Sequence, residues 1–481
     1  MKLEFGKDDQ DARHLVADRF SPMVEGAWFV PSYKTGFWDG KVHFFKEMPS
    51  TLPTMLLPEL LNTIHGTWDY KVERAVTKQF LPDKRVNGYE PTLPNFNLYW
   101  YQHGSTIKAL ERKRGIVQIA TGGGKAANII TTIKGCHQLG FGKKYLIIVP
   151  RKQLVVQFYE EFKKTGWSPY GEVGILHGDN KEGANAEFDV VIATWQTLSS
   201  LRNGKKKPKY GEKSSNLWYN RFIGSFDGVF VDEVHSAKAK VLSEIVSEFE
   251  CDFKIGFTAT MPKNIVDKYT VISTIGPVIW KTTSRELIET DFLAPLKIKM
   301  LNIAWEGIKF QSFQKERAWL EANPKRNNLI KKLAGIEINK NHNTLILVDK
   351  IKHGKDLEEK ITDISKNVYF VRGSMKIKDR EIIRKKMEVS TGNTIIATYG
   401  TFAMGIDIKA LHSVIFASPG KSEIRTIQSI GRGLRKSMAK TRLDLYDISD
   451  STKYATKHAA EREKIYIQEK YPYKKYFISA E

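Results

Sequence analysis

A glycine-rich turn that ends in a lysine is the first feature of this chain that could do chemistry. Residues 118–125 read Gln-Ile-Ala-Thr-Gly-Gly-Gly-Lys and stand between an apolar run and a helical segment. Glycines let consecutive backbone N–H groups turn onto phosphates, the lysine adds charge over the β/γ oxygens, and the helix N-terminus adds a favourable dipole. The pattern predicts a nucleotide-binding loop that comprises Thr121, Gly122, Gly123, Gly124, Lys125 and Ala126.

Ala126 departs from the usual form of this loop. The residue after the lysine is ordinarily Ser or Thr, whose hydroxyl binds Mg²⁺. Two interpretations follow: Mg²⁺ is held by an acidic residue and waters, or hydrolysis is weakened. A substitution introduced at this position is a third explanation.

An acidic tetrapeptide, Asp232-Glu-Val-His235, follows the apolar run 228–231. An Asp at a strand end beside a phosphate loop can hold Mg²⁺, and the adjacent Glu can polarise the attacking water. The sequence therefore predicts Asp232 as a metal ligand and catalytic residue and Glu233 as a catalytic residue. His235 is a candidate for coupling this site to a neighbouring loop.

Two arginines, Arg432 and Arg435, lie three residues apart in the segment 428–435. This spacing places them on one face of a helix. Across an interdomain cleft they would stabilise charge that develops on the γ-phosphate, as arginine fingers do. A solvated basic face is the alternative interpretation.

Short apolar runs that alternate with helical segments must position these residues. Continuous runs of this kind suit parallel strands buried on both faces. The pattern predicts two α/β domains in tandem, with strands at 115–119, 145–149, 189–193 and 228–231 in the first, and at 344–348, 368–371, 394–397, 413–417 and 443–446 in the second.

Composition narrows the class of protein. Lys and Arg outnumber Asp and Glu by 76 to 54, a net charge of +22, which favours a polyanionic partner such as nucleic acid. No run approaches the ~18 apolar residues of a membrane span, and the first ten residues lack the apolar core of a secretory signal. Two cysteines without metal-ligand spacing indicate a reducing, cytoplasmic setting, the host cytoplasm for a phage-encoded chain.

Two further segments carry expectations. Residues 28–45 are predicted to form two β-rich runs around an Asp39-Gly40 turn, with a helix at 55–64. Lys34 and Lys41 should face solvent near the aromatic rings of this segment. The basic stretch 202–215 is interpreted either as a solvated loop or as a loop that contacts DNA.

The order and spacing of all these motifs resemble the superfamily-2 (DEAD/DEAH-like) helicases over roughly residues 96–450. The resemblance implies two tandem RecA-like parallel-sheet motor domains, with a small N-terminal α+β domain, and the use of ATP and Mg²⁺. It implies adenine recognition by Gln102, nucleotide contacts by Gly405 and Asp407, and coupling of hydrolysis to movement by His235, Thr258, Thr260 and Gln428. It also implies contacts with the nucleic-acid backbone by Pro150, Arg151, Thr194, Gln196, Arg372 and Thr398.

Residues 36–41, 397–412, 420–422, 428–436 and 469–473 are similar to the phage UvsW-type recombination DNA helicases. This family implies an ATP-dependent DNA helicase that acts on single-stranded and branched duplex DNA, including forks, Holliday junctions and R-loops with their RNA–DNA hybrid. A double-strand DNA translocase of a restriction complex, an RNA helicase and a nucleic-acid-binding protein with an inactive motor are the alternatives.

The predicted domain organisation has five parts. Residues 1–90 form a small N-terminal DNA-binding domain, and residues 91–285 form the ATP-binding motor domain. Residues 286–330 are expected as a linker, 331–455 as the second motor domain and 456–481 as a C-terminal helical tail.

Overall fold

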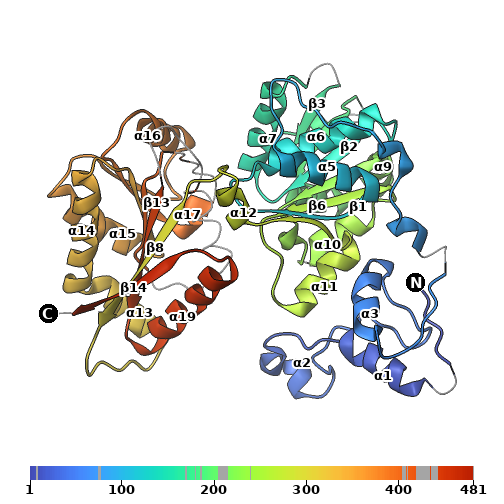
Figure 1. The fold of residues 1–481 in the computed structure, drawn as a ribbon, viewed down its shortest axis with the longest axis horizontal. Coiled ribbons are helices and arrows are strands. Elements are labelled where there is room, and N and C mark those ends of the chain that lie inside the picture. Colours follow the sequence, from blue (N-terminus) through green and yellow to red (C-terminus); the bar gives the residue numbers. More distant parts are fainter. Residues whose placement is uncertain are drawn as a thin grey trace. The chain divides into compact units, whose positions relative to one another are not determined.

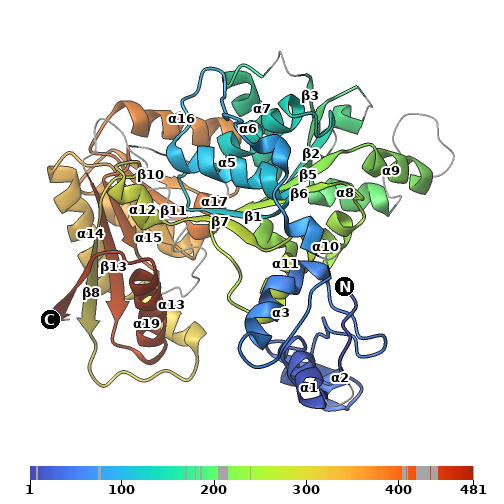
Figure 2. The same cartoon turned by 45° about the vertical axis from the view of Figure 1, so that its right-hand side comes forward.

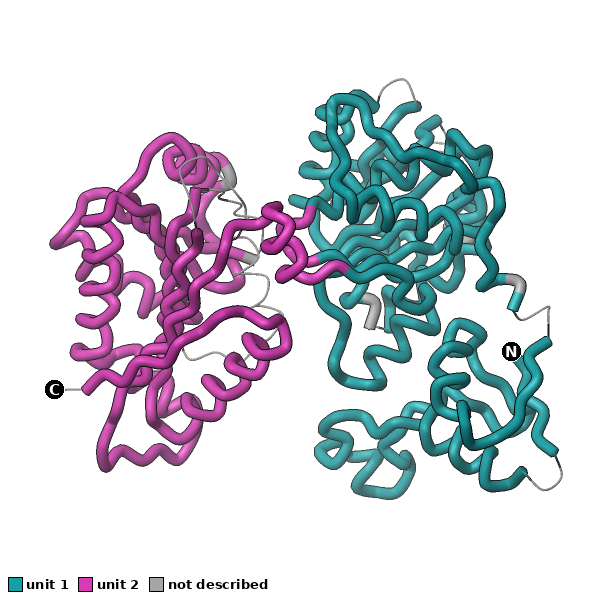
Figure 3. Tube along the Cα trace, viewed as in Figure 1, with its two compact units in different colours: residues 1–119, 124–281 teal, residues 120–123, 282–481 magenta. Residues whose placement is uncertain are grey.

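The computed structural model divides the chain into two compact units (Figure 3). Unit 1 comprises residues 1–119 and 124–281, and unit 2 comprises residues 120–123 and 282–481. The structure describes residues 1–6, 9–73, 77–167, 171–178, 180–184, 187–203, 215–238, 240–403, 408, 410–418, 434 and 442–479. Within these ranges, every helix is too short or too polar to span a lipid bilayer.

Unit 1 is built on a seven-stranded sheet with the order β3-β4-β2-β5-β6-β1-β7 (Figure 1). Its strands are β1 (Arg114–Ile119), β2 (Tyr145–Val149), β3 (Val173–Leu176), β4 (Val190–Thr194), β5 (Gly228–Asp232), β6 (Phe253–Thr258) and β7 (Val278–Thr282). Helix α5 (Trp100–Arg112) precedes β1, and the helices between the strands are α6 (Lys125–Gln138), α7 (Lys152–Lys164), α8 (Trp195–Arg202), α9 (Ser215–Gly224), α10 (Lys240–Ser247) and α11 (Ile265–Thr274). In both views α5, α6 and α7 lie on one face of the sheet, and α10 and α11 lie on the other (Figures 1 and 2).

Unit 2 holds a second seven-stranded sheet with the order β10-β11-β9-β12-β13-β8-β14. Its strands are β8 (Leu296–Ala304), β9 (Thr344–Val348), β10 (Val368–Val371), β11 (Thr394–Thr398), β12 (Ser413–Phe416), β13 (Leu443–Asp450) and β14 (Tyr473–Ser479). Its helices are α12 (Ser284–Glu289), α13 (Phe313–Ala322), α14 (Pro324–Asn339), α15 (Ile351–Thr362), α16 (Ile377–Val389), α17 (Tyr399–Ala403) and α19 (Lys453–Gln468).

The two sheets share one topology. When the strands of each sheet are numbered along the chain, both have the spatial order 3-4-2-5-6-1-7. All strand pairs whose register is described are parallel. The prediction of two tandem α/β domains with parallel sheets is therefore confirmed, and the second unit repeats the plan of the first.

The predicted hairpin over residues 28–45 is wrong. The described part of residues 1–90 contains α1 (Gln10–Arg19), α2 (Pro31–Lys34), α3 (Leu57–Ile64) and short 3₁₀ turns, with isolated β-bridges but no strand. Pro31 begins α2, where the fixed φ of proline favours a helical first turn. The chain after Gly40 then pairs with residues 22–24, because Val24 N–H donates to Gly40 O and Met23 forms a bridge with Lys41.

The expected linker, 286–330, and the expected helical tail, 456–481, also differ from the structure. The first range contains β8, which lies between β13 and β14 in the second sheet, and the second range ends in β14 itself. β8 alternates buried Leu296, Ile298 and Met300 with more exposed lysines. Continuous apolar runs were expected for parallel strands, so this alternating strand near the sheet edge was not predicted.

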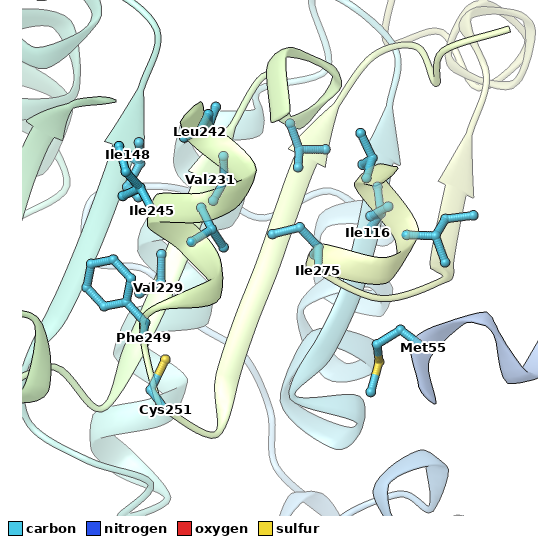
Figure 4. Packing of buried hydrophobic residues seen from close by; sticks show 14 of the residues in the cluster. Met55, Ile116, Ile148, Val229, Val231, Leu242, Ile245, Phe249, Cys251 and Ile275 are labelled. Carbon is cyan, nitrogen blue, oxygen red and sulfur yellow. The ribbon is translucent and has the colours of Figure 1, made fainter. Parts of the chain in front are cut away.

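The core of unit 1 joins the N-terminal segment to the first sheet. Buried residues of the segment, such as Phe20 and Met55, belong to one hydrophobic cluster with Ile116 of β1 and Ile275 after α11. Figure 4 shows Met55 on the same side of the sheet as Ile275 and Ile245. The first ninety residues are therefore packed against the motor domain rather than tethered to it.

Candidate nucleotide site and nucleic-acid cleft

The glycine-rich turn connects the end of β1 at Ile119 with the start of α6 at Lys125. Gly122 has φ +91° and Gly124 has φ +72°, a left-handed conformation that side chains rarely adopt. At Gly124 an added Cβ would also lie 2.7 Å from Gln102 Nε2. These two positions therefore require glycine, and the turn directs the N-terminus of α6 toward the end of the sheet.

The acidic pair lies beside this loop, although 107 residues separate Asp232 from Lys125 in the chain. β5 and β1 are both parallel to β6 and flank it, so the three carboxyl ends meet at one edge of the sheet. Lys125 Nζ lies 3.6 Å from Glu233 Oε1. Glu233 follows the strand with φ +49°, a backbone conformation that is uncommon outside glycine.

Asp232 is buried, and its Oδ1 has no hydrogen-bond partner among the described residues. Burial, and then the charge of Glu233, raise the pKa of Asp232 to about 7. A buried carboxylate oxygen without a partner fits a divalent cation. No group of three or more His, Cys, Asp and Glu side chains forms a metal cluster in the part of the chain that the structure describes. Mg²⁺ often takes one or two carboxylates and completes its shell with phosphates and water, so this site fits the ion.

His235 connects the acidic pair to the segment 258–260. His235 Nδ1 lies 3.0 Å from Thr258 Oγ1 and 3.4 Å from Glu233 Oε2. The Thr258 hydroxyl donates its one hydrogen to Thr260 O at 2.9 Å, so the hydrogen between His235 and Thr258 must be on Nδ1. The structure thus brings His235, Thr258 and Thr260, three of the predicted coupling residues, next to the predicted catalytic residue Glu233.

Gln102 lies in the first turn of α5 and is fully buried. Its Nε2 donates to Gly124 O at 3.4 Å, and its Oε1 accepts from Tyr99 N–H at 3.1 Å. Asn128 Nδ2 donates to Gln102 O at 2.8 Å and fixes α5 against α6. The predicted adenine-reading residue is therefore held next to the phosphate loop.

The predicted backbone contacts of unit 1 lie around one cleft of about 480 Å³ at the carboxyl ends of β2 and β4. Its lining residues are Pro150, Arg151, Lys152, Gly178, Thr194, Gln196, Thr197 and Ser200. Gln196 Nε2 donates to Pro150 O at 3.0 Å, which joins the two strand ends. Arg151 and Gln196 are exposed, whereas Thr194 is buried and bonded to Thr197 at 2.8 Å.

Unit 2 repeats this strand-end arrangement. The hydroxyl of Thr398, at the end of β11, is hydrogen-bonded to the hydroxyl of Thr401 at 2.7 Å. Thr194 and Thr197 form the same hydrogen bond in unit 1. Arg372 follows β10, which is parallel to β11 and adjacent to it. Sequence reasoning did not identify Thr197 and Thr401. The recurrence of Ala-Thr-aromatic-X-Thr at 193–197 and 397–401 was the signal that could have found them.

Several predicted site residues lie outside the described part of the chain: Gly405, Asp407, Gln428, Arg432, Arg435 and most of the basic stretch 202–215. The structure therefore describes the predicted site residues from Gln102 to Thr260, together with Arg372 and Thr398.

Two family models match the chain in the order that the two units suggest. The model described as "Type III restriction enzyme, res subunit" matches residues 95–263, and "Helicase conserved C-terminal domain" matches residues 324–437. The chain is a superfamily-2 helicase. The first model spans the phosphate loop and the acidic pair of the helicase, and the second spans most of the second sheet.

Similar proteins agree with this assignment. The helicase is 27% identical over 501 residues, covering 97% of this chain and 95% of the relative, to "ATP-dependent DNA helicase uvsW" of Enterobacteria phage T4. Two solved structures share its fold. One is the ATP-dependent Type ISP restriction-modification enzyme LlaBIII bound to DNA, with TM-score 0.55, 16% identity, and 80% of this chain and 32% of that chain covered. The other is S. cerevisiae Dbp5 bound to RNA and ADP BeF3, with TM-score 0.54, 14% identity, and 84% and 96% covered. The helicase is thus an ATP-dependent enzyme that binds nucleic acid.

Proposed function

We propose that this helicase uses ATP and Mg²⁺ to unwind or branch-migrate branched DNA, including forks, Holliday junctions and R-loops, in recombination, repair and replication restart. One observation carries the proposal: the similarity to the phage DNA helicase covers nearly the full length of both chains. It therefore extends through residues 1–94, which neither family model matches. A motor shared with many helicases would not by itself favour any particular substrate.

In this mechanism Lys125 and the backbone N–H groups of the glycine turn bind the β/γ-phosphates. Asp232 would hold Mg²⁺, which neutralises phosphate charge when it is bound. Glu233 orients the attacking water and accepts a hydrogen bond from it through a carboxylate oxygen. Arg432 and Arg435 stabilise the charge that develops on the γ-phosphate, in the role of arginine fingers.

Gln102 reads the adenine edge, and Gly405 and Asp407 contact the nucleotide from the second motor domain. Because His235 Nδ1 contacts both Glu233 and Thr258, a change in the charge at Glu233 reaches the segment 258–260 through one side chain. We assign the coupling of hydrolysis to movement to this path, which ends at Thr260, with Gln428 as its partner in the second unit.

The strand-end residues of each unit bind the nucleic-acid backbone. In unit 1 these are Arg151 and Gln196, positioned by Pro150 and Thr194, and in unit 2 they are Arg372 and Thr398. Such contacts reach phosphates rather than base edges, so they position the strand without reading its sequence.

The test compares ATP hydrolysis by the purified full chain in the presence of single-stranded, duplex, forked and R-loop nucleic acids. Strand displacement is measured on the same forks and R-loops. Stimulation and displacement that are greatest with the branched species are expected. Equal stimulation by all four, without displacement of any fork, would refute the branched-DNA proposal.

A double-strand DNA translocase is the second candidate. The family model over residues 95–263 is that of a restriction-enzyme subunit, which favours it. Displacement of a third strand from triplex DNA, without displacement of fork strands, would identify this activity. An RNA helicase would instead displace strands of duplex RNA.

A further inference from the structure

Three aromatic side chains of the N-terminal segment are exposed. Phe37 is 91% exposed, Phe29 is 74% exposed and Trp28 is 52% exposed. They lie in the short stretch 28–38, which comprises the end of the 3₁₀ turn Ala27–Phe29, α2 and the turn after it. We call these three rings the aromatic surface. The ring centroids of Trp28 and Phe29 lie 5.8 Å apart, and Phe37 follows eight residues after Phe29. Large exposed apolar side chains this close in sequence favour contact with a partner.

The backbone that carries the aromatic surface is held in one conformation. Trp38 Nε1 donates to Lys41 O at 3.0 Å, and Trp38 N–H donates to Ser32 O at 3.1 Å. Gly40 has φ +78°, and an added Cβ would lie 2.9 Å from ring carbons of Tyr33. The rings therefore project from a folded turn, and a partner that binds them does not first have to order the chain.

The charge of this region argues against a contact dominated by phosphates. Residues 1–90 contain 12 basic residues (Lys and Arg) and 13 acidic residues (Asp and Glu). The whole chain, in contrast, contains 76 basic and 54 acidic residues. The excess of positive charge therefore lies in the two motor units. A ligand of the aromatic surface must be recognised mainly by its apolar faces, and unpaired bases stack on aromatic rings in this way.

The N-terminal segment is also fixed to the motor element that follows the coupling residues. Tyr269 of α11 is fully buried, and its ring stacks on Phe20 at 5.3 Å and meets Phe44 edge-on at 5.6 Å. Lys268 forms an ion pair with Glu59 at 2.8 Å. α11 begins at Ile265, five residues after Thr260. A force generated by the motor would therefore reach the aromatic surface through a packed interface.

We propose that Trp28, Phe29 and Phe37 form a base-stacking surface for the unpaired strand at a DNA branch, carried by the first motor domain. The proposal rests on the proposed function, because a branch is where a helicase meets both a duplex and unpaired bases. As the motor moves along the duplex, rings that hold one separated strand would prevent it from pairing again.

The test is a Phe29→Ala/Phe37→Ala double variant of the full chain. Both rings are exposed, so the melting temperature should not change. Deleting the segment would be less informative, because it would uncover Tyr269 and the rest of the shared core. Phe477→Ala is the matched control, since this ring of unit 2 is 85% exposed.

We expect fork unwinding by the double variant to fall on the order of tenfold, as the loss of base stacking predicts. ATP hydrolysis stimulated by short single strands should change less than about twofold, since no hydrolysis residue is altered. The salt dependence of fork binding should keep its slope, because no phosphate contact is lost. The Phe29→Trp/Phe37→Trp variant should retain unwinding, and the Phe477→Ala control should behave as the wild type.

Full unwinding by the double alanine variant would overturn the proposal and leave a protein partner as the ligand of this surface. A shallower salt slope would also overturn it, because the segment would then bind phosphates. Wild-type protein that fails to unwind any fork would refute the proposed function instead, so the two failures are distinguishable.

Discussion

Replacing Glu233 by Gln separates the binding of ATP from its hydrolysis. The substitution preserves the shape of the side chain and removes the charge that orients water. We expect the ATP turnover number to fall on the order of 10²-fold or more. Glu233 Oε1 lies 3.6 Å from Lys125 Nζ, so the glutamate should also compete with phosphate for the lysine.

The size of this competition follows from the exposure of the pair. The two side chains are 13% and 22% exposed, and an ion pair with this access to water contributes about 1 kcal/mol or less. Releasing Lys125 should therefore leave ATP affinity unchanged or tighten it by up to about fivefold. Equilibrium binding of a fluorescent ATP analogue and steady-state hydrolysis with single-stranded DNA measure the two effects separately.

Glu248→Gln is the matched control, because Glu248 lies in the same unit, is 30% exposed and pairs with Arg202 at 2.7 Å. It removes the same charge away from the site and should leave both measurements near wild type. A normal turnover number in Glu233→Gln would refute the role of this residue in positioning water. Weaker ATP binding would refute the idea that its carboxylate competes for Lys125.

Three further predictions concern the same molecule. Lys125→Ala should abolish hydrolysis and leave DNA binding intact, and undiminished turnover in the purified variant would remove the phosphate-loop assignment. Ala126→Thr should raise the hydrolysis rate by restoring a hydroxyl ligand for Mg²⁺, whereas an unchanged rate with the same Mg²⁺ dependence would contradict this. Burial, with a smaller effect of Arg326, lowers the pKa of His353 from 6.5 to about 3. The unfolded state therefore binds the proton more tightly than the folded state. As the pH falls from 6.5 towards 3, the free energy of unfolding decreases, by about 2 kcal/mol at pH 5. His353→Gln keeps a donor for Asn327 Oδ1, and denaturant unfolding at pH 5 and 7.5 should show less pH dependence in this variant than in the wild type.

Sequence reasoning was most successful where the signal was local. The strands predicted at 145–149, 344–348 and 368–371 have these bounds in the structure, because continuous β-branched and apolar runs favour buried parallel strands. The glycine turn before α6 was predicted from an equally local signal, because glycines that permit a left-handed backbone directly precede a helix. Strands β8 and β14 were not predicted, because lysines interrupt the apolar residues along both strands, so that neither is a continuous apolar run.

The N-terminal segment shows how tertiary context overrides a local signal. Asp39-Gly40 is a common turn pair, but the chain after it pairs with residues 22–24 because Phe20 and Phe44 are packed on Tyr269, a residue distant in the sequence. Phe37 and Trp28 are exposed, and no pattern in the sequence distinguishes them from buried Phe20.

β13 gives the clearest separation between what sequence and tertiary structure decide. The sequence alone predicted that its first half, Leu443 to Tyr446, is a strand. It could not predict that the strand continues through buried Asp447 and Asp450, because buried carboxylates require partners. Those partners, Arg462 of α19 and Arg326 of α14, come from other elements and lie 2.6 and 3.0 Å away. Likewise, Lys125 and Glu233 meet only because two distant strands are parallel to the same neighbour. Propensity and turn chemistry act over a few residues and can be read in the sequence, whereas the pairing of charges across a core depends on which segments the folded sheet brings together.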